Sequence, residues 1–284
     1  MPELPEVETV RRGLNQATLG WPIGGGQVLL DRTVAYPLST SDFLDGLTGK
    51  KIVTWHRRGK YLLAELAAQN GAKSQGWLGV HLRMTGQLLW LDAHDDLQKH
   101  ARVRLFFDQG QELRFVDQRT FGQMWWVPPS HQPPEIISGL KQLGPEPFDS
   151  GFSVEYLAQY FHRRQRPVKN ALLDQRLVAG LGNIYADEAL FLSGIRPATL
   201  CSQLKLAQIQ RLHQQIRQVL EDAIQAGGTT IRNFLSVAGV NGNYSQTAWV
   251  YGREGEACRV CGTSIQRIKL AGRSAHFCPQ CQQS

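Results

Sequence analysis

The sequence predicts an α+β chain of several domains: a β-sandwich or flattened barrel with an N-terminal helix, a helical region, and a small cysteine-containing C-terminal module. Three observations predict this class. Between residues 26 and 127 the chain consists of short strand-like runs broken by Gly, Asn and Asp. After residue 150 apolar residues recur at helical spacing, and near the C-terminus four cysteines form two C-x-x-C pairs.

A short helix is predicted at residues 5–14. Pro5 suits the first helical position, and Glu6 and Glu8 favour its positive N-terminal end. Its apolar residues share one face: Val7, Val10 and Leu14.

Eight runs are predicted as strands, because several alternate in polarity or are rich in β-branched and aromatic residues. They are residues 27–30, 51–56, 61–66, 78–82, 87–91, 103–107, 112–116 and 123–127. We expect residues 2–130 to form one domain. The proline-rich segment 131–150 is predicted to be a linker.

Four helices are predicted in a second domain at residues 151–235. They are residues 153–162, 167–176, 184–193 and 202–226, the last ending at Gly227-Gly228. Residues 236–246 have no periodicity and many turn formers, so we expect a mobile loop there. The C-terminal module is then residues 247–284.

Composition excludes several classes of protein. The 284 residues suggest roughly two domains of about 100–200 residues each. A chain that is 42% hydrophobic and 19% charged is neither wholly disordered nor a membrane protein, and no apolar run approaches ~18 residues. The N-terminus lacks the features of a secretory signal. We therefore expect a soluble cytoplasmic protein.

The formal net charge of +7 is equivocal evidence for a nucleic-acid partner. One basic cluster lies at residues 163–169. A second lies in the last 35 residues, where five basic side chains outnumber Glu254 and Glu256. Each cluster has two interpretations, a solvated surface or a patch that faces phosphates.

The cysteine spacing predicts a structural zinc site. Cys258 and Cys261 form one C-x-x-C pair, Cys278 and Cys281 form the other, and sixteen residues separate the pairs. A pair of disulfides is the alternative, but no secretory signal accompanies these cysteines. Four thiolates leave no open position, so the zinc ion would hold together a segment too short to bury its own core. Cys201 stands alone and is expected to be a packing residue.

The N-terminus contains groups suited to covalent catalysis. Removal of Met1 would leave Pro2 with a free secondary amine, which can attack an electrophilic carbon and form a charged iminium. Glu3 and Glu6 are carboxylates available for proton transfer. On this pattern alone, ordinary helix-flanking residues are the favoured interpretation.

The Gly-Leu-Gly-Asn run at residues 180–183 opens a predicted helix. Free N–H groups at a helix start favour an anion, and Asn183 adds a neutral donor. An ordinary capped turn is the alternative.

Taken together, seven segments resemble the formamidopyrimidine-DNA glycosylases, in the expected order from residue 2 to residue 281. They are Met-Pro-Glu-Leu-Pro-Glu-Val-Glu-Thr at the N-terminus, Arg-Arg-Gly-Lys-Tyr-Leu-Leu (57–63), His-Leu-Arg-Met-Thr-Gly (81–86), Asp-Gln-Arg-Thr-Phe-Gly (117–122), Leu-Gly-Pro-Glu-Pro (143–147), Gly-Leu-Gly-Asn-Ile-Tyr-Ala-Asp-Glu (180–188) and the four-cysteine module.

The resemblance implies a fold and an activity. The fold would be an N-terminal catalytic β-sandwich carrying the first helix, a helix-two-turns-helix domain and a β-hairpin zinc finger, with double-stranded DNA between the lobes. The activity would be that of a bifunctional DNA glycosylase and AP lyase of bacterial base excision repair. Such an enzyme, expected as a monomer, flips out and removes an oxidised purine such as 8-oxoguanine or a formamidopyrimidine, and then nicks the strand.

The resemblance also assigns residues. Pro2 would be the nucleophile, Glu3 would transfer a proton at the sugar, and Glu6 would be a supporting carboxylate. Lys60 matches a proton donor in β-elimination, and Arg273 matches a residue acting in δ-elimination. Because a guanidinium hardly gives up a proton at neutral pH, we expect Arg273 to hold a phosphate.

The remaining matches concern DNA. Met84, Arg119 and Phe121 would fill the void left by the flipped base. The DNA-contacting positions would be His81, His100, Arg119, Arg164 and Asn183. The 236–246 loop would cover the flipped base.

Departures from the family pattern affect lesion preference. Thr120 stands where many relatives have a second arginine, and Arg83 replaces a frequent glycine. An endonuclease VIII-like glycosylase for oxidised pyrimidines is one alternative, but Leu4 and the continuation Val7-Glu8-Thr9 argue against it. A zinc-dependent DNA-binding protein without activity is the other. It would not need Pro2, Glu3 and Lys60 together.

Overall fold

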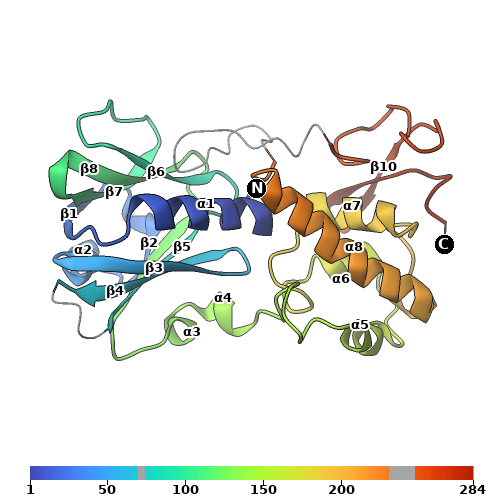
Figure 1. Cartoon of the computed structure of the whole chain (residues 1–284), viewed down its shortest axis with the longest axis horizontal. Coiled ribbons are helices and arrows are strands. Elements are labelled where there is room, and N and C mark those ends of the chain that lie inside the picture. Colours follow the sequence, from blue (N-terminus) through green and yellow to red (C-terminus); the bar gives the residue numbers. More distant parts are fainter. Residues whose placement is uncertain (70–73, 230–246, 284) are drawn as a thin grey trace. The chain divides into compact units, whose positions relative to one another are not determined.

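A computed structural model describes residues 1–69, 74–229 and 247–283, and the chain divides into two compact units (Figure 1). Among the described residues, unit 1 comprises Met1–Lys141 with residues 227–229, and unit 2 comprises Gln142–Ala226 with residues 247–283. The loop predicted at residues 236–246 lies outside the described residues.

Unit 1 is a β-sandwich with an N-terminal helix, as predicted. The five-stranded sheet has the order β2 (Val34–Tyr36), β9 (Gln123–Val127), β5 (Ser74–His81), β4 (Tyr61–Ala68) and β3 (Lys50–Arg58). The four-stranded sheet has the order β1 (Ile23–Val28), β7 (Ala101–Phe107), β8 (Gln111–Asp117) and β6 (Gly86–Asp92). Neighbouring strands are antiparallel, except that β2 runs parallel to β9.

The core of unit 1 lies between the two sheets. Along β7 the burial alternates, with Val103 and Leu105 inside, which is the period-2 pattern of a half-buried strand. Helix α1 (Leu4–Ala17) contributes Val7, Val10 and Leu14 to the same cluster. Burying an apolar side chain of this size stabilises by about 1.5–3 kcal/mol.

Among the strands and α-helices within residues 1–130, two were not predicted. The strand β2 has only three residues, and helix α2 (Thr40–Leu47) has eight. Ser39 caps α2 by accepting from the backbone N–H of Asp42 (3.2 Å). Inside α2, Gly46 packs against Trp126, because a Cβ at Gly46 would lie 2.1 Å from the indole. Tertiary packing therefore selects a residue that weakens the local helical signal.

The segment predicted as a linker contains two short helices, α3 (Pro133–Ile136) and α4 (Ser138–Lys141). Ile137 between them is buried, and the Cβ position of Gly79 on β5 lies 2.6 Å from its side chain. The first part of this segment therefore packs on the sandwich.

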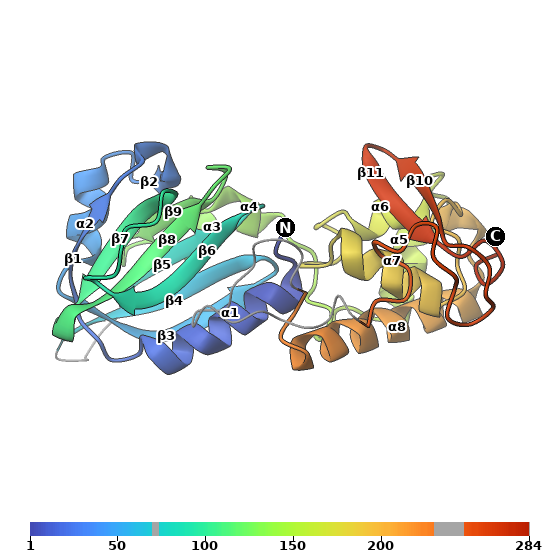
Figure 2. The same cartoon turned by 90° about the horizontal axis from the view of Figure 1, so that it is seen from above.

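Helix α1 lies along β3 (Figure 2), and a series of polar contacts aligns the two. Asn15 accepts from the backbone N–H of Trp55 (2.8 Å) and donates to its carbonyl (3.0 Å). Nearer the N-terminus, Glu8 pairs with Arg57 (3.2 Å). This progression places the N-terminal end of α1 near the turn between β3 and β4, as both views show.

Unit 2 contains helices α5 (Val154–Phe161), α6 (Val168–Leu172), α7 (Asn183–Leu192) and α8 (Leu206–Gln225), and a hairpin of β10 (Gln266–Leu270) and β11 (Arg273–Phe277). Helix α7 is buried on nearly all sides and contacts α6, α8 and β11. Cys201 is buried, and burial raises the pKa of its thiol to about 11, which suits a packing residue. In the described part of the chain, no helix combines the length and apolar character needed to cross a bilayer.

Candidate active site and metal centre

The N-terminal residues are held by one buried carboxylate. Pro2 and Glu3 are buried where α1 begins, and Glu6 lies one turn later. Glu6 Oε2 accepts from the backbone N–H of Glu3 (2.8 Å). Its Oε1 accepts from both the backbone N–H (2.8 Å) and the hydroxyl (2.9 Å) of Thr229. Glu6 therefore ties the first residues of the chain to the segment that follows α8.

The Gly228 backbone approaches the same carboxylate closely. A Cβ at Gly228 would lie 2.9 Å from Glu6 Oε1, and the Gly228 φ of +80° is rarely adopted by other residues. A side chain at this position would therefore push Glu6 away from the N-terminus.

Lys60 and His81 lie at the same end of the sandwich. Lys60 is buried in the β3–β4 turn, and Tyr61 pairs with His81 across β4 and β5, their ring centroids 4.5 Å apart. Burial, together with the charges of Arg83 and Lys60, lowers the pKa of His81 to about 3. His81 is therefore neutral at physiological pH.

The hydrogen bonding of His81 selects its tautomer. The backbone N–H of Arg83 donates to His81 Nδ1 (3.0 Å), so the neutral ring carries its proton on Nε2. His81 can thus act as a neutral N–H donor.

The three proposed void-filling residues lie on two adjacent turns. Met84 is on the β5–β6 turn, while Arg119 and Phe121 are on the β8–β9 turn, with the guanidinium 5.0 Å from the ring centroid. Met84 is 37% exposed and Phe121 is 51% exposed, which is unusual for large apolar side chains. The structure therefore brings together an apolar residue, a cation and an aromatic ring, all accessible to a ligand.

A buried carboxylate joins these two turns. Asp117 accepts from the Thr85 hydroxyl, and its other oxygen accepts from the backbone N–H of Gly122 (2.7 Å). The backbone N–H of Arg119 donates to Thr85 Oγ1 (3.0 Å). Asp117 also donates its own N–H to the carbonyl of His100 (2.9 Å), which places this predicted DNA-contacting residue beside the same turns.

Unit 2 contains the other proposed DNA-contacting residues. Arg164 is exposed just after α5, and its guanidinium lies 4.0 Å from the ring centroid of Tyr160. Asn183 begins α7, and its buried amide oxygen accepts no hydrogen bond from the described residues. Gln175 holds the preceding turn, because it accepts from Gly180 N–H (2.9 Å) and donates to the Leu181 carbonyl (2.8 Å).

The basic cluster at residues 163–169 is not one continuous patch. Arg163 and Arg164 are exposed, whereas Lys169 is completely buried and forms an ion pair with Asp187 (Nζ–Oδ1 2.6 Å). A phosphate-facing surface that included Lys169 is therefore a wrong interpretation of the cluster. The spacing of basic residues could not reveal it, because the partner lies on another helix.

The four predicted zinc ligands converge. Their Sγ atoms all lie within 4.8 Å of one another, with 3.9 Å between Cys258 and Cys281 and 3.4 Å between Cys261 and Cys278. A tetrahedral zinc ion with Zn–S bonds of about 2.3 Å places its sulfur atoms about 3.8 Å apart. The donor set and its spacing therefore fit one structural zinc ion, and Cys258 and Cys278 also pack in a small apolar cluster.

The thiol environments differ within this cluster. Hydrogen bonds from Thr263 lower the pKa of the Cys261 thiol to about 6, whereas burial raises the pKa of Cys278 and Cys281. Four thiolates this close would repel one another without a cation. A bound zinc ion supplies that charge and favours the ionised form of all four.

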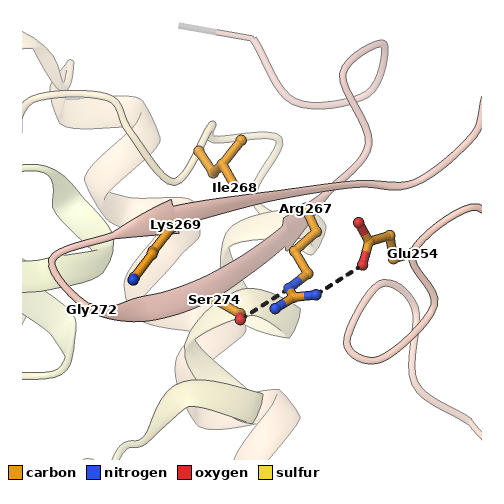
Figure 3. A pocket seen from close by; sticks show the side chains of 6 residues that line it. All are labelled: Glu254, Arg267, Ile268, Lys269, Gly272 and Ser274. Atoms are coloured by element: carbon orange, nitrogen blue, oxygen red, sulfur yellow. Dashed lines mark hydrogen bonds and ion pairs between the residues drawn. The ribbon is translucent and has the colours of Figure 1, made fainter.

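Arg273 lies at the tip of the zinc-module hairpin. It pairs with Leu270 across the two-residue turn Ala271-Gly272, whose φ angles of 44° and 80° fit the tight turn of a β-hairpin. The hairpin also borders a polar cavity of about 400 Å³ (Figure 3). Arg267 lies across it and contacts Ser274 Oγ (3.0 Å) and the Glu254 carboxylate (3.1 Å).

Known proteins match every part of this architecture. Residues 1–124 match the formamidopyrimidine-DNA glycosylase N-terminal domain, residues 143–235 match the formamidopyrimidine-DNA glycosylase H2TH domain, and residues 255–283 match the "Zinc finger found in FPG and IleRS". The chain belongs to the formamidopyrimidine-DNA glycosylase family. Its predicted fold of sandwich, helix-two-turns-helix domain and β-hairpin zinc finger is confirmed, as is the single zinc site.

Individual relatives cover the full length. The formamidopyrimidine-DNA glycosylase of Nostoc sp. is 66% identical over 282 residues, which are 99% of this chain and 100% of the relative. That of Nostoc punctiforme is 65% identical over 282 residues, covering 99% and 96% respectively.

Solved structures of formamidopyrimidine-DNA glycosylases have the same fold as this chain. A complex of a Lactococcus lactis formamidopyrimidine-DNA glycosylase mutant with Fapy-dG-containing DNA has a TM-score of 0.91 at 37% identity, and covers 100% of both chains. The Lactococcus lactis enzyme bound to abasic-site DNA has a TM-score of 0.90 at 37% identity, and covers 99% of this chain and 100% of that chain.

Sequence reasoning missed the residues that hold the family's motifs in place. Thr229 binds Glu6, Asp117 joins the two exposed turns, and Lys169 and Asp187 form a buried ion pair. Asp117 and Asp187 lie within two of the segments that carry the family resemblance, so the sequence already singled out their positions. Thr229 carried no such signal.

Proposed function

We propose that this chain, a DNA glycosylase of base excision repair, excises oxidised purines from duplex DNA through a Schiff base on Pro2 and then cleaves the strand by β,δ-elimination. The observation that carries this proposal is the burial of Pro2 and Glu3, with the Glu3 backbone N–H held by the Glu6 carboxylate that also binds Thr229. An ordinary N-terminus frays and needs no such contact. A buried Pro2 next to a backbone held in this way suits a nucleophile that must be aligned with one carbon atom.

The proposed chemistry begins after removal of Met1. The Pro2 nitrogen attacks C1′ of the damaged nucleotide and loses its proton, and the bond from C1′ to the base breaks with its electron pair leaving on the base. The C1′–O4′ bond then breaks with its electron pair going to O4′, which takes up a proton, so that the sugar ring opens and C1′ forms an iminium with the Pro2 nitrogen. The resulting iminium acidifies the C2′ hydrogen, so that loss of this proton expels the 3′ phosphate, and loss of the C4′ proton then expels the 5′ phosphate. Glu3 would transfer a proton at the sugar, and Lys60 would be the donor in β-elimination.

The remaining residues bind DNA in this proposal. His81 offers a neutral Nε2–H donor, and His100, Arg164 and Asn183 would contact the DNA backbone. Met84, Arg119 and Phe121 would fill the space left by the flipped nucleotide, because unstacking a base costs a few kcal/mol that new contacts must offset. Arg273 would bind a phosphate and stabilise its leaving charge.

The relatives' substrates favour this proposal. Lactococcus lactis structures contain DNA with Fapy-dG, an abasic site or an oxidised pyrimidine. The last of these makes an oxidised pyrimidine a second candidate substrate. We expect purine lesions to be preferred, since the chain opens with Leu4 and Val7-Glu8-Thr9.

Borohydride trapping tests both the reaction and the nucleophile. Duplexes containing 8-oxoguanine, a formamidopyrimidine or an oxidised pyrimidine are incubated with the protein and reduced, and the covalent adduct is measured. We expect the fastest trapping with the purine lesions and strong loss of trapping in Pro2→Gly. Absence of an adduct with every lesion would overturn the enzymatic proposal. An adduct unchanged by Pro2→Gly would overturn the assignment of the nucleophile.

A further inference from the structure

The strand β11 has one edge that pairs with β10 and one that faces the helices of unit 2. In the observed register, Leu270 and Arg273 form the pair next to the turn. Backbone groups of successive residues in an antiparallel pair point alternately toward and away from the partner strand. Ser274 and His276 therefore direct their backbone groups to the edge that β10 does not cover.

Two side chains occupy this second edge in place of a strand. Lys169 on α6 donates to the carbonyl of Ser274, and Asp187 on α7 accepts from the backbone N–H of His276 (2.9 Å). The Asp187 Oδ2 atom also lies 3.3 Å from His276 Nδ1. One carbonyl and one N–H, two residues apart, are the groups that a neighbouring strand would bind.

The two side chains also compensate each other's charge. Lys169 and Asp187 are both 0% exposed, and Nζ lies 2.6 Å from Oδ1. A buried charge without a partner is strongly unfavourable, so each of the two residues needs the other at this position. The pair is therefore a rigid, directional contact between α6, α7 and β11.

We infer that Asp187 is a positioning residue for Arg273: with Lys169, it binds the open edge of β11 and so fixes the hairpin tip that carries the arginine. The inference rests on the proposed role of Arg273 in δ-elimination. Ser274, the residue that Lys169 binds, directly follows Arg273. Asp187 and Lys169 touch no DNA in this inference and act only through the backbone of β11.

The neighbouring carboxylate of Glu188 holds another part of the zinc module, so the effect of Asp187 on the hairpin can be separated from loss of the whole zinc module. Glu188 accepts backbone hydrogen bonds from Trp249 (2.7 Å), Val250 (3.0 Å) and Tyr251 (2.9 Å). Adjacent residues of α7 thus hold two different parts of the zinc module. Substitution of Asp187 releases the hairpin edge while Glu188 and the four cysteines keep the module attached and folded.

The test measures the two elimination products separately on duplex DNA with an abasic site, under single-turnover conditions. The β product ends in a sugar fragment and the δ product ends in a phosphate, so a denaturing gel resolves them. For Asp187→Ala we expect the δ-elimination rate to fall about 10- to 100-fold, the loss typical of a catalytic group misplaced by about 1 Å. The β-elimination rate should change less than about threefold. Glu256→Gln, which alters the ion pair between the exposed Glu256 and Arg253 in the same module, should change neither.

A double-mutant cycle with Arg273→Ala decides whether Asp187 acts through the arginine. If it does, Asp187→Ala lowers the δ rate in the native background and has no further effect in Arg273→Ala. An unchanged product ratio, or independent and additive losses, would overturn the inference. If Arg273→Ala itself leaves δ-elimination intact, the proposed role of Arg273 fails, and this inference falls with it.

Zinc content and circular dichroism are measured for every variant. If Asp187→Ala loses zinc, the double-mutant cycle with Arg273→Ala is repeated with the variant Lys169→Met/Asp187→Leu in place of Asp187→Ala. It replaces the ion pair with apolar side chains of similar volume, which proteins often tolerate. This variant removes the edge contacts without leaving a buried charge, and the same outcomes apply to it.

Discussion

The carboxylate of Glu6 provides the most direct test of how the N-terminal amine is held. Glu6 is 2% exposed and accepts three hydrogen bonds, one from Glu3 and two from Thr229. Glu6→Ala leaves these donors without that acceptor. A hydrogen bond to a charged group contributes about 1.5–3 kcal/mol, but contributions that share one carboxylate do not add fully. We expect the contacts together to stabilise by about 3–5 kcal/mol.

Only part of this loss should appear in global unfolding. The chain start and residues 227–229 can open locally and reach water, which limits the loss to the free energy of that local opening. The larger effect falls on catalysis, since a misplaced nucleophile typically reacts about 100-fold more slowly. Thr229→Val removes only the hydroxyl donor and should have a small effect, about 1 kcal/mol.

The assay combines borohydride trapping with amide hydrogen exchange. In Glu6→Ala the trapping rate should fall about 100-fold, and the amides of Glu3 and Thr229 should exchange faster. Glu65→Gln is the matched control, because its contact with His56 is long (3.9 Å) and half-exposed. Trapping at the native rate, with both amides still protected, would refute the reasoning, because the N-terminus would then be held without this carboxylate.

Two further predictions concern pH and the metal. Burial raises the pKa of Glu8, but hydrogen bonds from Arg11 and Arg12 and the charges of Arg11 and Arg57 outweigh it and lower the pKa from 4.5 to about 2. Glu8 therefore stabilises the fold above pH 4.5 by about 1–2 kcal/mol after solvent screening, and this is lost as the pH falls toward 2. Denaturant unfolding measured between about pH 2 and 7 should show that this pH dependence is absent in Glu8→Gln. If the free energy of unfolding falls with pH equally in the native protein and in Glu8→Gln, the prediction is contradicted. Cys278→Ser should weaken DNA binding and nicking by misplacing Arg273 without unfolding the sandwich. Circular dichroism that showed global loss of structure would exclude that explanation.

Local patterns determined much of the fold. Alternating polarity, or enrichment in β-branched and aromatic residues, predicted runs that overlap eight of the nine strands described in unit 1, because both patterns depend only on neighbouring residues. The helices α7 and α8 and the zinc cysteines were also predictable, since helical periodicity and C-x-x-C spacing operate over a few residues. Elements that depend on packing were missed: α2 contains Gly46, whose absent side chain makes room for Trp126.

The candidate site follows the same division. The sequence by itself identified Pro2 and Arg273 as chemically useful groups, from residue type and resemblance. Only the tertiary structure decided what holds them: Thr229 binds Glu6 across 223 positions, and Lys169 reaches Ser274 across 105. Local residue spacing cannot predict such partners, because they are far apart in the sequence and only the folded chain brings them together. Lys169 shows the consequence most clearly: a basic cluster suggested phosphate binding, whereas burial beside Asp187 makes this lysine part of the scaffold.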